Sequence, residues 1–234
     1  MITDLLPAPR AILFDLDGTL ADTAPDLAAA INLLRARAGL APTPYDILRP
    51  TASAGARGMI GASYGVQPGE SGYEALKDGF LNNYEAALAV ESRLFDGIPA
   101  MLEGLQALGL AWGVVTNKPG WLTDPLLAAL GLDHRASCIV SGDTVAERKP
   151  HPLPLLHAAA LVGVAPAHCV YVGDAERDIQ AGRAAGMTTV VAAYGYISAE
   201  DDPAGWQPTG IIAEPGELLE WVGAAAASAV GERR

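Results

Sequence analysis

The sequence predicts an α/β protein: a doubly wound, mostly parallel sheet with a helical module inserted after the first strand. Short apolar runs alternate with helical segments along the C-terminal half, which is the pattern of β-α-β units. The first apolar run ends at residue 14, but the next comparable run begins only at residue 111. A crossover between parallel strands needs only about a dozen residues. The intervening stretch must therefore contain a module of its own.

The first expected strand, residues 11–14, leads directly into two carboxylates. Its sequence Ala-Ile-Leu-Phe is apolar throughout, as in a strand buried on both faces. Asp15 and Asp17 follow two residues apart, so they would share a face if the strand continued. Gly18 then allows a sharp turn. Because clustered like charges destabilise one another, the two acids indicate a functional site at the strand end.

The inserted module covers residues 22–92, and the core combines residues 1–21 with residues 93–234. Apolar residues in the first part of the insertion recur at helical spacing, and Gly39 follows as a stop signal. The helices of the module are expected at residues 25–37, 45–48, 57–63 and 73–90.

The rest of the core alternates helices with strands. Gly109, Gly131 and Gly186 directly follow the helices expected before them, as is common at helix C-termini. The alanine-rich segment from residue 223 onward is expected to be the fraying end of a last helix. Helices are expected at residues 99–108, 123–130, 152–162 and 175–185, and strands at residues 111–116, 138–141, 169–173, 188–192 and 210–213.

Composition limits the classes of partner. The formal net charge of −12 argues against binding to nucleic acid or to anionic membrane surfaces, so an anionic substrate would have to be captured by local cations. No apolar run reaches the ~20 residues that span a bilayer, and the N-terminal segment lacks the apolar stretch of a signal peptide. Cys138 and Cys169 lie in apolar runs and are expected to be free thiols. A cytoplasmic location is the simplest expectation.

Polar residues follow several of the expected strands at their carboxyl ends, where sheets of this kind bind ligands. The second strand ends at Thr116, with Asn117 and Lys118 directly after it, and Asp174 follows the fourth. Asp178 lies four residues further on and shares a face of the next helix with Asp174. Lys149 stands before a proline just ahead of a helix. Each residue alone has an ordinary structural explanation, but together they indicate one site.

The order of these motifs resembles the haloacid dehalogenase (HAD) superfamily. The helical insertion directly after the first motif is similar to the type of this superfamily that carries a C1 cap. The resemblance covers nearly the whole chain, from residue 11 to about residue 217. The similar motifs are Asp-x-Asp-Gly-Thr at residues 15–19, Thr-Asn at 116–117, Lys-Pro at 149–150 and Gly-Asp-x-x-x-Asp at 173–178.

Different segments of the sequence resemble two different branches of the superfamily. Residues 114–119 and 149–154 look like the phosphoglycolate phosphatase branch. Residues 194–197, together with Asp202 and Trp206, are closer to N-acetylmuramic acid 6-phosphate phosphatase. The first resemblance implies a small carboxylate-bearing phosphate ester such as 2-phosphoglycolate as substrate, and the second is the alternative.

Charge at the expected site calls for a metal ion. At ~4 Å and an effective dielectric constant of about 20, each pair of unit charges between a phosphate and Asp15 or Asp17 costs roughly 4 kcal/mol. Lys149 alone cannot offset several such pairs, so a divalent cation is required. Carboxylate ligands without a thiol or imidazole cluster favour Mg²⁺. The resemblance implies that Asp15, the backbone carbonyl of Asp17 and Asp174 hold the ion, with Asp178 in support.

The resemblance also implies the roles of the site residues. Asp15 is the expected nucleophile and forms an aspartyl-phosphate, while Asp17 acts as general acid and then general base. The second acid favours a phosphate-transferring enzyme over a dehalogenase, because a halide leaves without a proton. The expected phosphoryl-binding residues are Thr116, Asn117, Lys149 and Gly18.

Other activities remain open at this point. A phosphomutase similar to β-phosphoglucomutase would keep every motif. A signalling receiver domain also accepts phosphate on an aspartate, but it has about half this length and no helical insertion. A catalytically inactive binding protein is disfavoured because no motif residue is missing. The expected partner is a small-molecule phosphate ester, and the choice between monomer and homodimer stays open.

The insertion is expected to act as a mobile lid, with hinges at residues 23–25 and 96–97. The segment 53–57 is the best candidate for a substrate contact, because its small residues allow close approach and Arg57 suits a carboxylate. A solvated helix charge is an equally open interpretation of Arg57. Arg177 either orients Asp178 or is solvated. The histidines expected to be structural or exposed are His134, His151, His157 and His168.

Overall fold

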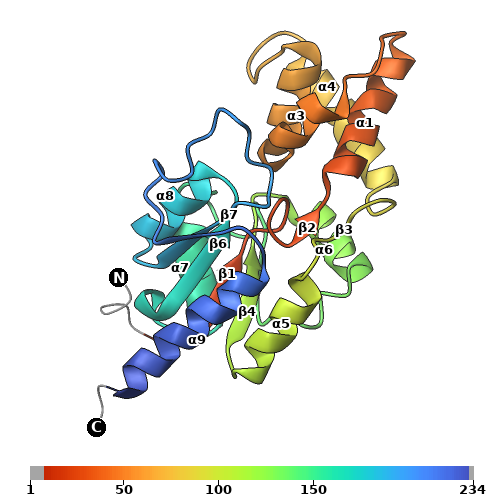
Figure 1. The fold of residues 1–234 in the computed structure, drawn as a ribbon. Coiled ribbons are helices and arrows are strands. Elements are labelled where there is room, and N and C mark those ends of the chain that lie inside the picture. Colours follow the sequence, from red (N-terminus) through yellow and green to blue (C-terminus); the bar gives the residue numbers. More distant parts are fainter. Residues whose placement is uncertain (1–7, 232–234) are drawn as a thin grey trace.

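The computed structural model describes residues 8–231, with side chains described for residues 8–223. Figure 1 shows an α/β core with a group of helices set beyond one edge of it. None of the described helices is long and apolar enough to cross a membrane.

The core is a six-stranded sheet in the order β5-β4-β1-β6-β7-β8, and all its neighbouring strands pair in parallel. The predicted fold class is therefore confirmed. β1 lies in the middle, between β4 and β6, so the carboxyl ends of these three strands meet at one place. The strands are β1 (Ala11–Phe14), β4 (Ala111–Val115), β5 (Ile139–Val140), β6 (Cys169–Gly173), β7 (Thr188–Ala192) and β8 (Gly210–Ile212).

Helices cover both faces of the sheet. α5 (Ile98–Ala107), α6 (Gly120–Ala129) and α9 (Gly216–Gly231) pack on one face, where their apolar residues join those of β1 and β4 in one buried cluster. α7 (Leu153–Leu161) and α8 (Glu176–Ala184) pack on the other face. A short 3₁₀ helix, η2 (Pro166–His168), precedes β6.

The inserted module has its own apolar core, made by residues such as Ile31, Met59 and Phe80. Two residues of the α/β core, Leu122 and Tyr196, belong to the same cluster. The module therefore packs directly on the core. Its elements are α1 (Ala24–Arg37), α2 (Tyr45–Leu48), the 3₁₀ helix η1 (Arg49–Ala54), α3 (Gly55–Tyr64) and α4 (Tyr73–Ala86).

The two connections between module and core run side by side. β2 (Ala21–Asp22) pairs antiparallel with β3 (Arg93–Leu94), which makes a small second sheet (Figure 1). This ribbon was not predicted, because strands of two residues show no periodicity.

Several helix boundaries differ from the predicted ones by one or two residues, and two differ by three or more for identifiable reasons. The helix predicted at 73–90 ends at Ala86, and the amides of Val90, Glu91 and Ser92 instead donate to the buried Asp26 carboxylate. The helix predicted at 123–130 begins three residues earlier, at Gly120. The amide of Gly120 donates to Asp143 Oδ1 over 2.8 Å, which satisfies one of the free donors of the first turn.

Candidate active site

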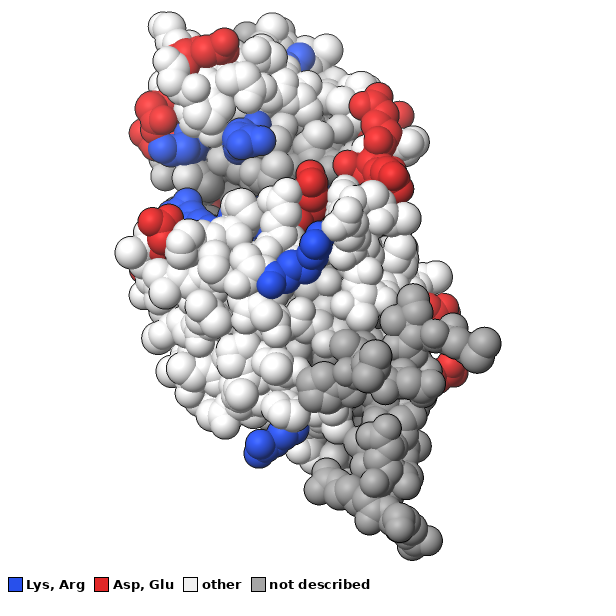
Figure 2. All heavy atoms as spheres, turned by 90° about the vertical axis from the view of Figure 1, so that its left-hand side faces the viewer, with Lys and Arg blue, Asp and Glu red and all other residues white. Residues whose placement is uncertain are grey.

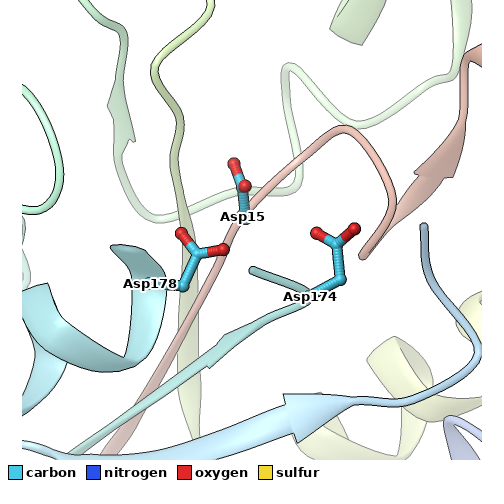
Figure 3. Close-up of side chains that lie close together, drawn as sticks. All are labelled: Asp15, Asp174 and Asp178. Atoms are coloured by element: carbon cyan, nitrogen blue, oxygen red, sulfur yellow. The ribbon is translucent and has the colours of Figure 1, made fainter. Parts of the chain in front are cut away.

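Three buried carboxylates face one another at the carboxyl ends of β1 and β6 (Figure 3). Asp15 directly follows β1, Asp174 follows β6, and Asp178 lies in the first turn of α8. Their exposed fractions are 3%, 2% and 0%, and one oxygen from each lies within 4.8 Å of the others. Carboxylates this close and this buried repel strongly, so they need cationic partners.

Lys149 supplies one such partner. Its buried ammonium lies 2.9 Å from Asp15 Oδ1 and 2.8 Å from Asp178 Oδ1. It also donates to the Val115 carbonyl and to the Tyr171 hydroxyl, at 2.9 and 2.7 Å. A single ammonium thus compensates two of the three acids.

Asn117 holds Lys149 in place. Its side-chain amide donates to the Lys149 carbonyl over 2.9 Å and accepts the Lys149 backbone N–H over 3.0 Å. This paired contact joins the loop after β4 to the loop before α7. Two residues that the sequence assigns to phosphoryl binding are therefore in direct contact.

Asp174 has hydrogen-bond partners of a different kind, because all of them are neutral. Oδ2 accepts from Ser53 Oγ at 2.6 Å and from the Tyr196 backbone N–H at 3.0 Å, and Oδ1 accepts from Thr19 Oγ1 at 3.2 Å. Burial, with help from the neighbouring acids, raises the pKa of Asp174 to about 7. Burial likewise raises the pKa of Asp178.

The donor set of the cluster suits a hard divalent cation. Carboxylate oxygens from three acids converge, and within the described residues Asp174 lacks an ion pair that would compensate its charge. The backbone carbonyl of Asp17 lies at the same place, since Ser53 Oγ reaches both it, at 3.3 Å, and Asp174. Oxygen ligands of this type are those that Mg²⁺ prefers.

Asp17 is bound by residues outside the three-acid cluster. Its Oδ1 accepts from Lys118 Nζ at 2.9 Å and from Thr23 Oγ1 at 2.6 Å. The Lys118 ammonium also lies 4.7 Å from the ring centroid of Tyr84 in α4. Burial lowers the pKa of Lys118, but the Asp17 carboxylate and Tyr84 outweigh burial and the pKa rises overall, so Lys118 stays charged. The sequence placed Lys118 at the end of the second strand with Thr116 and Asn117, but it assigned Lys118 no role in the site.

Gly18 and Thr116 complete the loops around the acids. Gly18 has φ of +84°, and a Cβ there would lie 2.2 Å from Asp174 Oδ2. Only glycine fits at this position. Thr116 is buried directly after β4, and its hydroxyl accepts the Lys118 backbone N–H at 3.1 Å.

The two arginines considered from the sequence lie at different places. Arg57 is exposed on α3 and lines the same cavity as the acids; among the described residues its guanidinium makes no hydrogen bond or ion pair. Arg177 donates to the Ser53 backbone carbonyl over 2.7 Å. Neither interpretation of Arg177 anticipated this contact between α8 and the inserted module.

The cavity between core and module has a volume of about 1050 Å³. Six of the chain's 15 Lys and Arg line it, against only six of its 27 Asp and Glu. Figure 2 shows basic side chains, together with acidic ones, on both sides of the narrowing where the two parts of the molecule meet. An acidic protein therefore presents a comparatively basic pocket, as expected for capture of an anion by local cations.

Comparison with known proteins agrees with this geometry. The family model of haloacid dehalogenase-like hydrolases matches residues 12–192. A phosphoglycolate phosphatase of Xanthomonas campestris pv. campestris is 48% identical over 212 residues, which cover 91% of this chain and 96% of that protein. An N-acetylmuramic acid 6-phosphate phosphatase of Pseudomonas aeruginosa is 43% identical over 211 residues, with 90% and 93% covered.

A solved structure is similar over almost the whole chain. It is that of a protein from Haemophilus somnus described as a predicted phosphoglycolate phosphatase, with a TM-score of 0.79 and 30% sequence identity. The match covers 92% of this chain and 99% of that one. The motif resemblance inferred from the sequence is confirmed by both kinds of comparison.

The raised pKa of Asp174 predicts how the stability of the metal-free protein depends on pH. An unfolded Asp releases its proton near pH 3.9, whereas the folded protein keeps this one up to about pH 7. The free energy of unfolding should therefore fall as pH rises through this window, by at most about 3 kcal/mol between pH 5 and 8. The side chain introduced by Asp174→Asn cannot ionise, so the free energy of unfolding of this variant should fall less over the same pH range.

Urea unfolding of both proteins in EDTA at pH 5 and pH 8 measures this difference. Adding Mg²⁺ should stabilise the wild type most at pH 8. If the free energy of unfolding fell by the same amount in the wild type and the variant between pH 5 and pH 8, the ionisation could not be assigned to Asp174.

Proposed function

This chain belongs to the haloacid dehalogenase-like hydrolase family and is a phosphatase, and we propose that it hydrolyses phosphate monoesters with Mg²⁺ through an aspartyl-phosphate on Asp15. One observation carries the proposal: a buried Asp174 carboxylate with only neutral partners lies beside an Asp15 that Lys149 holds in place. Such a cluster is suited to binding a cation and a phosphate dianion together.

Mg²⁺ would be held by the carboxylates of Asp15 and Asp174 and by the backbone carbonyl of Asp17. When bound, it neutralises phosphoryl charge and orients the ester for displacement. Asp178 acts in support: it is fixed by the Ala175 backbone N–H at 3.0 Å and by Lys149 at 2.8 Å.

Asp15 attacks phosphorus in line, so that a carboxylate oxygen–phosphorus bond forms as the ester bond breaks. Its Oδ1 is occupied by Lys149 Nζ at 2.9 Å and by the Leu16 backbone N–H at 2.8 Å. Oδ2 accepts no hydrogen bond within the described residues. Lys149, Thr116 and the backbone amide of Asn117 bind the phosphoryl oxygens.

Asp17 transfers the protons. It protonates the leaving alkoxide and then takes a proton from the water that hydrolyses the aspartyl-phosphate. Its side chain lines the same cavity as Asp15 and is oriented by Lys118 and Thr23. Net hydrolysis, rather than return of the phosphoryl group to the substrate, distinguishes this activity from that of a phosphomutase.

The substrate is a phosphate ester that also carries a carboxylate, which Arg57 contacts. The names of the relatives suggest 2-phosphoglycolate first and N-acetylmuramic acid 6-phosphate second. The cavity supports the second candidate: its volume of about 1050 Å³ is large for a two-carbon acid, since pockets of roughly 300–1,000 Å³ hold drug-sized ligands. Tyr73, Trp121 and Trp206 line it and offer apolar surface for a sugar ring.

Asp15→Asn tests the nucleophile. The substitution keeps the size of the side chain but prevents a stable covalent intermediate, so turnover should be abolished while the fold is retained. Wild-type protein with Mg²⁺ and beryllofluoride should carry the adduct on Asp15, as seen by crystallography or NMR. An adduct on another residue would overturn the assignment.

Metal removal tests the charge argument. EDTA should abolish phosphate release from p-nitrophenyl phosphate, and Mg²⁺ should restore it. Ca²⁺ should inhibit, because it takes more ligands at longer distances and would engage Asp15 away from phosphorus. Unchanged activity in EDTA would refute the need for a cation.

Arg57→Ala tests the carboxylate contact. For the true substrate, kcat/KM should fall by about 1.5–3 kcal/mol, the range for a hydrogen bond to a charged group. For p-nitrophenyl phosphate, which has no carboxylate, the loss should be much smaller. Lys77→Ala is a matched control, because Lys77 also lines the cavity but is paired with Glu74. Equal losses on both substrates would mean that Arg57 serves the fold or the core chemistry.

The substrate itself is identified by ranking kcat/KM over a panel of phosphomonoesters. The panel includes 2-phosphoglycolate, N-acetylmuramic acid 6-phosphate and sugar phosphates without a carboxylate. Formation of an isomerised product without net phosphate release would identify a phosphomutase instead.

A further inference from the structure

The loop after β7 brings Tyr196 to the junction of core, module and acid cluster. The residue is only 3% exposed. It lies within the segment 194–197 that the sequence singled out, and no step of the proposed reaction uses its side chain.

The Tyr196 hydroxyl makes three contacts with the first connection to the module. It accepts the backbone N–H groups of Thr23, at 2.6 Å, and Ala24, at 2.9 Å, and it donates to Asp22 Oδ1 at 2.8 Å. A hydroxyl has two acceptor lone pairs and one donor proton, so every hydrogen-bonding position of this phenol is used.

These contacts replace the usual cap of α1. The helix begins at Ala24, and Thr23 at the N-cap position makes no side-chain capping bond. The Thr23 hydroxyl instead donates to Asp17 Oδ1. Two of the backbone N–H groups at the helix start, those of Thr23 and Ala24, are satisfied by a phenol from a loop more than 170 residues further along the chain. Tyr196 thereby leaves the Thr23 hydroxyl available to Asp17.

The rest of Tyr196 contacts the acid cluster and the module. Its backbone N–H donates to Asp174 Oδ2 at 3.0 Å. Arg49 of η1 lies with its guanidinium carbon 5.1 Å from the ring centroid, and it donates to the Gly195 carbonyl at 3.2 Å. One residue therefore contacts the connection, the module and a proposed metal ligand.

We propose that Tyr196 is a positioning residue that fixes the start of α1, and with it the inserted module, relative to Asp174. The proposal rests on the proposed function in one respect: the module is taken to contact the substrate. Without the hydroxyl, the first turn of α1 loses its cap and the module is less firmly oriented over the cavity.

Tyr196→Phe isolates this role, because it removes only the hydroxyl and keeps the ring against Arg49 and the backbone N–H on Asp174. Tyr194→Phe is the matched control: Tyr194 lies in the same loop, and its hydroxyl donates to the Thr19 carbonyl at 3.0 Å without contacting the module connection.

Hydrogen exchange is measured on the full-length chain with Mg²⁺. In Tyr196→Phe, the amides of Thr23 and Ala24 should exchange about tenfold faster than in the wild type, which corresponds to about 1.4 kcal/mol, the size of a typical hydrogen bond. Tyr194→Phe should leave these two amides at the wild-type rate. Equal protection in Tyr196→Phe and wild type would overturn the proposal.

Kinetics provide the second readout. In Tyr196→Phe, kcat/KM should fall at least fivefold more for the carboxylate-bearing ester than for p-nitrophenyl phosphate, because only the former uses the module. Equal losses on both substrates would show that the Tyr196 hydroxyl serves the fold or the core chemistry rather than the module, and the positioning role would be wrong. If the wild type released no phosphate from any ester, the proposed function would fail, while the exchange measurement would still test the cap.

Discussion

The buried ammonium of Lys149 is the interaction on which the site depends. Without it, Asp15 and Asp178 would be two carboxylates with almost no exposure and no cation between them. Breaking a buried ion pair by removing one partner costs about 3–5 kcal/mol, so the cluster requires this residue. This need explains why several neighbouring groups hold Lys149 in place. The Asn117 side chain bonds both the backbone N–H and the backbone carbonyl of Lys149, and the Val115 carbonyl and the Tyr171 hydroxyl lie within hydrogen-bond distance of its ammonium.

The strand order makes this clustering possible. β1 lies between β4 and β6, so the loops that follow these three strands start from neighbouring positions. Residues separated by more than a hundred positions, such as Asp15 and Asp174, then come within reach without any long loop. Lys149 compensates the charges of two of the acids. Asp174 is left with neutral hydrogen-bond donors alone, so within the described residues the charge balance of the cluster is incomplete at this carboxylate. In the proposed function, a divalent cation completes that balance.

The sequence predicted the parts of this arrangement that depend on local pattern. β1, α2, β6 and β7 have the predicted limits, because apolar runs and flanking breakers are local signals. The residues at the strand ends were also predictable, because parallel strands bring their carboxyl ends together. Contacts between distant segments were not: Lys118 pairs with Asp17 across 101 positions, and Arg177 reaches Ser53 across 124. No periodicity or spacing encodes such pairs, and the ribbon of β2 and β3 is too short to leave a pattern.

The position of the inserted module and the orientation of Asp174 cannot vary independently. One oxygen, Asp174 Oδ2, accepts both from Ser53 of the module and from the amide of Tyr196. Tyr196 in turn holds the start of α1, which carries the module. A shift of the module therefore changes the hydrogen bonds of the one acid whose charge Lys149 leaves uncompensated. Ser53 of the module and Tyr196, which bonds the start of α1, both contact this atom, so in the proposed function the substrate contacts of the module and the geometry of this metal ligand are set together.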